Sequence, residues 1–166
     1  AIRINGAELR AQVVGEGANL GMTQEGRIEA AHAGVRINTD AIDNSAGVDS
    51  SDHEVNIKIL TSGAIASGAL KAGDRNALLA SMTDEVGEKV LAHNYDQPLA
   101  LTLQQAEGAA ALDAQQRFMQ WLGAKGKLDR KVEGLPSDAR LAEMKATGLA
   151  LTRPELAVLT AYSKIE

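Results

Sequence analysis

The chain has no cysteine among its 166 residues. A disulfide framework, a thiolate metal site and a cysteine nucleophile are therefore excluded. No apolar run approaches the roughly 20 residues that a membrane-spanning helix needs. The first five residues also lack the basic-then-apolar layout of a secretory signal. These absences predict a protein of the reducing cytoplasm with no membrane partner.

Aromatic residues are scarce, and positive charge is not concentrated anywhere. The net charge is −5, and Lys and Arg are dispersed along the sequence. A nucleic-acid-binding surface normally combines a basic stripe with stacking aromatic side chains. We therefore expect no nucleic-acid partner. Trp121, beside Phe118 and Met119, is expected in the core or in an interface rather than at a cofactor.

Glycine, by contrast, is abundant, with 16 residues against three prolines, and many of them fall within the first 75 positions. The composition changes near Gly73, and this change predicts two regions, 1–73 and 74–166. We predict an α/β, predominantly helical fold in which a truncated Rossmann-like βαβ portion is followed by an α-helical region.

The first region carries the pattern strand, turn, helix, strand. Residues 12–14 are short, β-branched and bounded by glycine, as in a buried parallel strand. Thr23 is placed to cap a helix that Gly34 ends, and residues 35–39 form the next strand. Before this unit, Asn5-Gly6 is typical of a hairpin turn.

Further helices are expected along the rest of the chain. The segment from Asp52 to Ser62 has acidic residues suited to a helix N-terminus, although its apolar alternation leaves a strand as the alternative. Leu112, Met119 and Leu122 form an apolar stripe at helical spacing. Other helices are expected to begin at Thr83, Pro98, Ser137 and Thr152.

Two turns rich in small polar residues follow the two strands. They are Val13–Asn19 and Ile42–Ser51, and in an open α/β sheet ligands bind beyond the carboxyl ends of the strands. The amide of Asn19 could both donate to and accept from a carboxamide ligand. The second turn leads into a helix N-terminus, which favours an anion. The alternative for both segments is an ordinary tight turn or helix cap.

The three histidines show no spacing typical of a metal or catalytic site. No H-x-x-x-H pattern is present, and His53 is expected to be exposed on the first turn of its helix. His32 and His93 are expected to have no partners and no role. We therefore predict no metal site, and Arg27, Arg36, Arg75 and Arg153 are expected to be solvated or structural.

Several long ungapped segments carry a resemblance to a known family. They are Val14–Thr23, Ile37–Asn56, Met82–Val86, Asn94-Tyr95 and Leu151–Leu159. Together they resemble the large bacterial NAD-specific glutamate dehydrogenases. Those enzymes are far longer, so the chain resembles an internal fragment that covers the end of the dinucleotide-binding domain and the following helices.

The resemblance implies oxidative deamination of L-glutamate to 2-oxoglutarate and ammonia, with hydride passed to NAD. It implies that the cofactor is contacted by Gly17, Ala18, Asn19 and Asn44, and the substrate by Val48 and Ser51. The chain departs from the smaller glutamate dehydrogenases at Ala46, where they have glycine, and at Asp52-His53, where they have an aromatic pair.

The family's catalytic Lys and Asp and its glycine-rich phosphate loop lie upstream of the matching segments. No lysine precedes Lys58, so we expect no catalytic residue in this fragment, no dehydrogenase activity and at most feeble NAD affinity. The alternatives are a non-catalytic helical interaction module with a small βαβ cap, and a small-ligand binder that uses only the Asn19 and Asn44 turns. The free edge of a truncated sheet also predicts a homo-oligomer.

Overall fold

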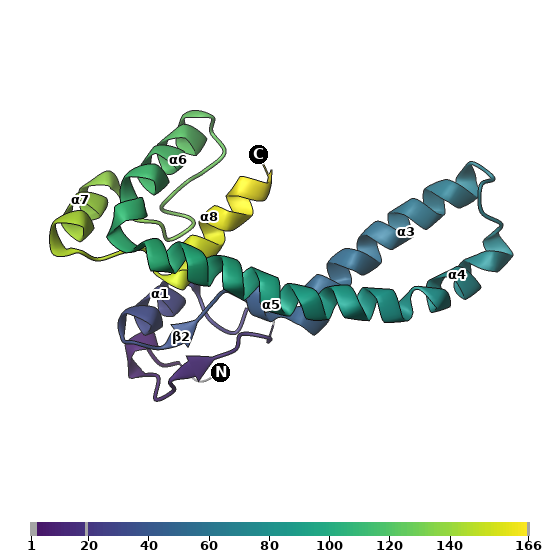
Figure 1. Ribbon diagram of the computed structural model, residues 1–166, viewed down its shortest axis with the longest axis horizontal. Coiled ribbons are helices and arrows are strands. Elements are labelled where there is room, and N and C mark those ends of the chain that lie inside the picture. The colour runs from purple at the N-terminus through teal and green to yellow at the C-terminus, as the bar shows by residue number, and fades with distance from the viewer. Residues whose placement is uncertain (1–2, 19, 166) are drawn as a thin grey trace.

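The computed structural model describes residues 3–18 and 20–165, and helices make up most of that part of the chain (Figure 1). Its strands and longer helices are β1 (Val13–Val14), α1 (Gln24–His32), β2 (Arg36–Ile37), α2 (Asp40–Asp43), α3 (Ser50–Ala66), α4 (Arg75–Ser81), α5 (Thr83–Glu107), α6 (Leu112–Ala124), α7 (Asp138–Thr147) and α8 (Arg153–Ile165). Shorter turns of helix are η1 (Gly6–Glu8), η2 (Ser45–Asp49), η3 (Ala72–Asp74) and η4 (Gly108–Ala111). The predominantly helical α/β fold is thereby confirmed.

The predicted βαβ unit is present. β1 and β2 pair in parallel, with Val13 opposite Arg36 and Val14 opposite Ile37. α1 connects them, and the Thr23 hydroxyl caps it by accepting a hydrogen bond from the backbone N–H of Gly26 at 3.0 Å. The strands are shorter than expected, and the prediction that the first one is buried is wrong, because Val13 is 66% exposed at the edge of the two-stranded sheet. A small core of Ala30, Val35 and Ile37 holds the helix against the sheet.

The predicted hairpin at Asn5-Gly6 is wrong, because these residues begin the 3-10 helix η1. The backbone N–H of Asn5 donates to the Glu8 carboxylate at 2.8 Å, and that of Gly6 donates to Glu29 of α1, also at 2.8 Å. Gly6 is buried against α1. Its lack of a side chain therefore serves close packing against a helix rather than a reverse turn.

The segment predicted to be helical from Asp52 to Ser62 lies inside the longer helix α3, so the strand alternative is excluded. The π-helical turn η2 leads directly into it. Thr61 is the one fully buried residue among those of α3. The alternation of Val55, Ile57 and Ile59 resembles a strand because this helix has no single buried apolar face.

Pro98 was predicted to open a new helix, and this prediction is wrong. It lies in the interior of α5. A proline there removes one backbone hydrogen bond and costs about 3 kcal/mol or more. The helix continues because its C-terminal half is anchored: Leu101 is fully buried, and the Pro98 carbonyl accepts a hydrogen bond from Arg153 at 3.1 Å. Tertiary contacts here outweigh the local preference.

The C-terminal helices surround the larger core. α7 starts at Ser137, whose hydroxyl accepts from the Arg140 N–H at 3.2 Å, and Gly148 ends it in the left-handed conformation, as the sequence predicts. Trp121 is 44% exposed and stacks on Phe118, so it lies at the edge of this core. The buried residues of the core are Leu101, Leu112, Met119, Leu122, Leu128, Leu135, Leu141, Met144, Leu151, Leu156, Ala157 and Leu159.

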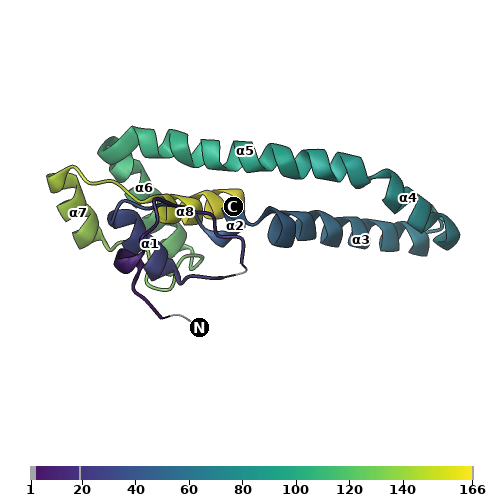
Figure 2. The same cartoon turned by 90° about the horizontal axis from the view of Figure 1, so that it is seen from below.

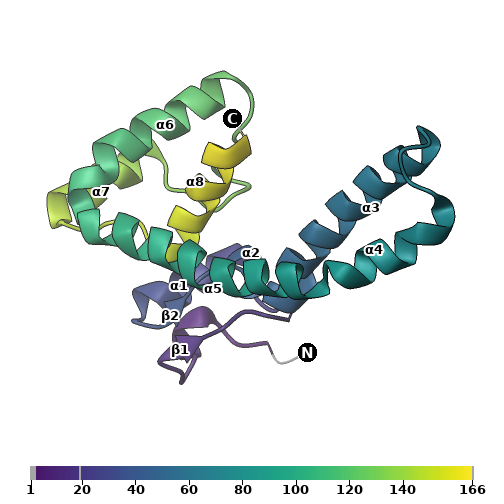
Figure 3. The same cartoon turned by 45° about the vertical axis from the view of Figure 1, so that its right-hand side comes forward.

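An extended arm projects from these packed elements (Figures 1 and 2). α3 leads away from the sheet, and α4 and the first half of α5 lead back; the two legs diverge toward the tip (Figure 3). The other half of α5 packs against α8, which packs against α1. Large apolar side chains are exposed on this arm: Val55, Ile59, Leu60, Leu91 and Tyr95.

Among the described helices, none combines the length and apolar character that crossing a membrane requires.

Replacing Gly6 by alanine tests the packing of η1 on α1. The added methyl carbon would lie 2.2 Å from the Gly26 carbonyl oxygen and 2.9 Å from the Ala30 nitrogen. Because both are helix backbone atoms, we expect Gly6→Ala to lower the free energy of unfolding by about 1–3 kcal/mol. Urea denaturation followed by circular dichroism measures this. Gly73→Ala is the control, because its added carbon would meet no atom within 4 Å; equal stability of both variants would contradict the packing.

Candidate functional site

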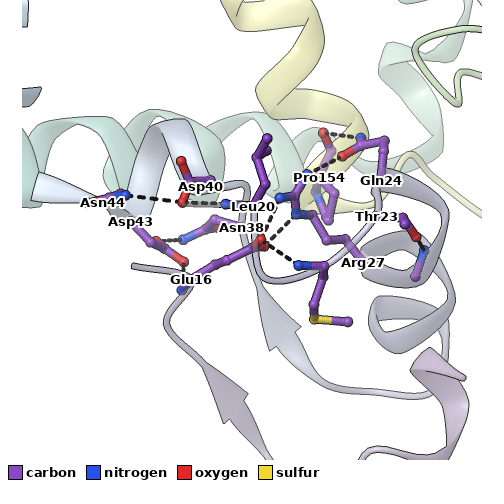
Figure 4. A network of polar contacts seen from close by, with 12 residues as sticks. Glu16, Leu20, Thr23, Gln24, Arg27, Asn38, Asp40, Asp43, Asn44 and Pro154 are labelled. Carbon is purple, nitrogen blue, oxygen red and sulfur yellow. Dashed lines mark hydrogen bonds and ion pairs between the residues drawn. The ribbon is translucent and has the colours of Figure 1, made fainter. Parts of the chain in front are cut away.

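A buried ion pair lies between the turn after β1 and helix α1. Glu16 is 3% exposed and Arg27 is 5% exposed. The Arg27 guanidinium donates from Nε and Nη2 to the two carboxylate oxygens of Glu16 (Figure 4). The backbone N–H of Met22 donates to the same carboxylate at 3.0 Å. These bonds fix the turn over residues 15–22 onto the first part of α1.

The two turns that follow the strands are joined by carboxylates. The backbone N–H of Glu16 donates to Asp43 at 3.2 Å, and that of Leu20 donates to Asp40 at 3.4 Å. The Asn38 amide, just after β2, also donates to Asp43, at 2.7 Å. The ends of the two parallel strands therefore lie side by side (Figure 4).

Helix α8 contributes a third element from the far end of the sequence. Arg153 donates from Nε to the Asn38 side-chain oxygen at 2.7 Å and from Nη1 to the Thr102 hydroxyl at 3.0 Å. Burial lowers the pKa of Arg153, and the Asp43 carboxylate opposes that shift. The Gln24 amide donates to the Pro154 carbonyl at 3.1 Å. The first turn of α8 thus braces the end of β2.

A cleft of about 720 Å³ lies between the sheet and the helices α5 and α8. Gly15, Asn38 and Asp43 line it from the strand ends, and Thr102 and Arg153 line it from the helices. Of the predicted site residues that the structure describes, Gly17, Ala18, Asn44, Val48 and Ser51 do not line it. The cleft therefore lies beside the predicted cofactor turn. Asp43 contacts both, because it lines the cleft and accepts a hydrogen bond from the Glu16 N–H of that turn.

The predicted cofactor residues differ in their exposure. Gly17 and Ala18 are exposed, and Asn19 lies outside the described residues. Asn44 is only 4% exposed. Its side-chain oxygen accepts from the Gly47 N–H at 2.8 Å and its amide nitrogen donates to Asp40 at 3.2 Å. In this chain, therefore, the Asn44 side chain fixes the shape of the second turn.

The predicted substrate residues lie in the C-terminal part of the second turn. Val48 belongs to η2 and Ser51 to the first turn of α3, and both are half-buried. Within the described part of the chain, the Ser51 hydroxyl makes no hydrogen bond. Turns of π-helix such as η2 frequently occur at functional sites. A serine hydroxyl can donate a hydrogen bond to an anionic group.

The expectation that His53 is exposed and that His93 has no partner is wrong. His93 Nδ1 lies 3.0 and 3.1 Å from the two carboxylate oxygens of Asp49. His53 Nδ1 lies 3.5 Å from the same carboxylate, and the two imidazole rings are 5.6 Å apart. Sequence spacing could not reveal this cluster, because His93 comes from α5.

Sequence reasoning also missed Glu16, Asp40 and Asp43, which hold the turns. Arg27 was expected to be solvated or structural, and its buried pair with Glu16 makes it structural. One signal was available for the ion pair. A carboxylate in a glycine-flanked turn after a buried strand needs a positive partner if it is buried, and Arg27 lies one turn into the following helix.

A family model supplies independent information on this arrangement. The model described as "Bacterial NAD-glutamate dehydrogenase, catalytic domain" matches residues 1–104. The chain belongs to this family. The matched segment includes the sheet, both turns after the strands, the arm and the histidine cluster, whereas α6–α8 follow it.

Individual family members align over nearly the whole chain. The chain is 53% identical over 165 residues to an NAD-specific glutamate dehydrogenase from Pseudomonas aeruginosa. It is 52% identical over 164 residues to one from Halomonas elongata and 48% identical over 164 residues to one from Mycobacterium tuberculosis. Each alignment covers 99% of this chain and 10% of the relative. The chain thus spans about a tenth of the length of these family members.

Replacing Arg27 by methionine tests the buried ion pair. The Glu16 carboxylate would stay buried without a positive partner, so we expect Arg27→Met to lower the free energy of unfolding by about 3–5 kcal/mol. Urea denaturation measures the loss. Adding Glu16→Gln removes the unpaired charge and should recover part of the stability.

Lys58→Met is the matched control, because it breaks the exposed Glu54–Lys58 pair. Exposed pairs contribute little, so this variant should unfold almost as the unmodified chain does. A similar loss of stability in both lysine and arginine variants would contradict a special role for the buried pair.

Proposed function

We propose that this chain is one part of an NAD-dependent glutamate dehydrogenase, an enzyme that converts L-glutamate, NAD and water to 2-oxoglutarate, ammonia and NADH. Family membership supports this proposal, and one structural observation carries it. The turns after β1 and β2 are joined through Asp40 and Asp43. They lie beyond the carboxyl ends of parallel strands, where open α/β sheets bind nucleotides and their substrates.

The first turn would serve the nicotinamide side of the cofactor, through Gly17, Ala18 and Asn19. A side chain at Gly17 would have no neighbour within 4 Å, so the backbone there is open to a closely approaching ring. Asn44 would act as the residue that shapes the second turn beneath the cofactor. Its buried bonds to Asp40 and Gly47 support that role.

The second turn would serve the substrate. Val48 would flank the aliphatic chain of glutamate, and the Ser51 hydroxyl would donate a hydrogen bond to a substrate carboxylate. The chain would thus position the substrate next to the cofactor, while proton transfer belongs to the Lys and Asp upstream in the family.

The remaining parts of the proposal rest on sequence. A division into 1–73, the end of a dinucleotide-binding domain, and 74–166, a helical region, follows from the change in composition. Cytoplasmic location is an expectation based on the lack of cysteine. Homo-oligomeric assembly is supported by the edge of β1, where Val13 is 66% exposed.

One observation favours the alternative of a non-catalytic helical interaction module. The arm exposes several large apolar side chains, among them Leu60 and Leu91, and such surfaces commonly contact other protein. In the main proposal the same surface faces the rest of the enzyme. NAD binding distinguishes the two.

The isolated chain should show no turnover of glutamate with NAD, measured as NADH absorbance. It should bind NAD weakly, and the changes in amide chemical shift on adding NAD should be confined to residues 15–21 and 40–51. Shifts spread over α6–α8, or none at saturating NAD, would favour the interaction module instead. Measurable turnover would contradict the assignment of proton transfer to residues outside this chain.

Within the full-length enzyme, Ser51→Ala tests the substrate side. Loss of a hydrogen bond to a charged group should raise the KM for glutamate about tenfold or more and leave the KM for NAD unchanged. Ser62→Ala is the matched control, because Ser62 is an exposed serine of the same helix. If Ser51→Ala and Ser62→Ala have the same KM for glutamate, the substrate role of Ser51 is wrong.

A further inference from the structure

Asp49, His53 and His93 form a cluster that the proposed function does not use. Asp49 ends η2, His53 lies in the first turns of α3, and His93 comes from α5. All three are half-buried, and each offers one ligand atom within 4.8 Å of the other two. No other group of three such side chains was found in the described part of the chain.

The spacing of these atoms fits the coordination sphere of a small metal ion. A tetrahedral ion with bonds of 2.0–2.1 Å holds neighbouring ligand atoms about 3.3 Å apart. His93 Nδ1 and the Asp49 carboxylate oxygens are 3.0 and 3.1 Å apart. The remaining ligand atom lies within 4.8 Å of the other two, and His53 Nδ1 is 3.5 Å from the Asp49 carboxylate.

The donor set indicates which class of ion would bind. Two imidazoles and one carboxylate suit zinc and its neighbours in the first transition series, whereas magnesium and calcium prefer oxygen ligands alone. Three protein ligands also leave a further position for water or a ligand. With no thiol in the chain, softer ions have no preferred donors here.

The surrounding contacts would hold the ligands in place. Asp49 and His53 are four residues apart, which places them on one face of the helix. His53 Nδ1 lies 2.9 Å from the backbone carbonyl oxygen of Asp49. A metal-bound histidine is commonly oriented by such a hydrogen bond of one ring nitrogen, so this contact holds the His53 ring beside the Asp49 carboxylate.

We propose that Asp49, His53 and His93 bind one divalent transition-metal ion of the zinc class. The ion joins the start of α3 to α5 at the base of the arm. Asp49 follows Val48 directly and lies two residues before Ser51, so the ion also fixes the turn that carries both residues. The metal site does not depend on the dehydrogenase assignment, because its residues are not those of the proposed cofactor and substrate contacts.

The chain offers a close internal control for this proposal. It has three histidines and no cysteine, so His32 is the one histidine outside the cluster. We expect zinc titration against a chromogenic chelator to show one ion bound per chain. His53→Ala, His93→Ala and the shape-conserving Asp49→Asn should each raise the Kd at least about tenfold, as loss of even an outer-shell partner does. His32→Ala should leave the Kd unchanged.

A cysteine at position 93 distinguishes loss of a metal ligand from loss of packing. His93→Cys keeps a zinc ligand, so it should bind zinc even if His93→Ala loses helical circular dichroism, and failure of this variant to bind would overturn the proposal. The proposal is also overturned if the unmodified chain takes up no zinc at micromolar concentration, or if His32→Ala weakens binding as much as the cluster variants. None of these readouts requires NAD, glutamate or turnover, so they are independent of the proposed function.

Discussion

The buried pair of Glu16 and Arg27 is the constraint on which the candidate site depends. A carboxylate taken out of water requires a positive partner and further hydrogen bonds, and here the guanidinium and the Met22 N–H supply them. Such a pair need not add net stability, since removing two charges from water is costly. Its effect is geometric, because it defines the path of the chain between β1 and α1. Asp43 then accepts from the Glu16 N–H and ties that path to the end of β2.

Local sequence signals predicted the elements whose ends are decided locally. Thr23, Ser137 and Gly148 mark helix ends because their side chains or backbone angles satisfy terminal polar groups, and the structure has them there. The errors at Gly6 and Pro98 have the opposite origin. Contacts with α1 and α8 determine the conformation there, and a turn dipeptide or a proline viewed alone does not report such contacts.

In the candidate site, too, the features set by local sequence were predictable and those set by distant contacts were not. That the two strand ends meet follows from parallel pairing, which the short β-branched segments predicted. The partners that complete the region could not be predicted, because Arg153 reaches Asn38 across 115 residues and His93 reaches Asp49 across 44. No periodicity links such positions. The roles of Gly17, Ala18, Asn19, Asn44, Val48 and Ser51 toward NAD and glutamate stay predictions.

Helix α5 connects the arm to the core. At 1.5 Å per residue its 25 residues extend about 37 Å, from the tip region of the arm to the core beside α8. Pro98, near its middle, has no backbone N–H to donate, and its carbonyl oxygen accepts a hydrogen bond from Arg153. The same helix also packs against α2, η2 and α3, so it joins the arm to the core beside α8 as one continuous element. A displacement of α5 at Pro98 would therefore be passed to Arg153 and, through it, to Asn38 at the end of β2.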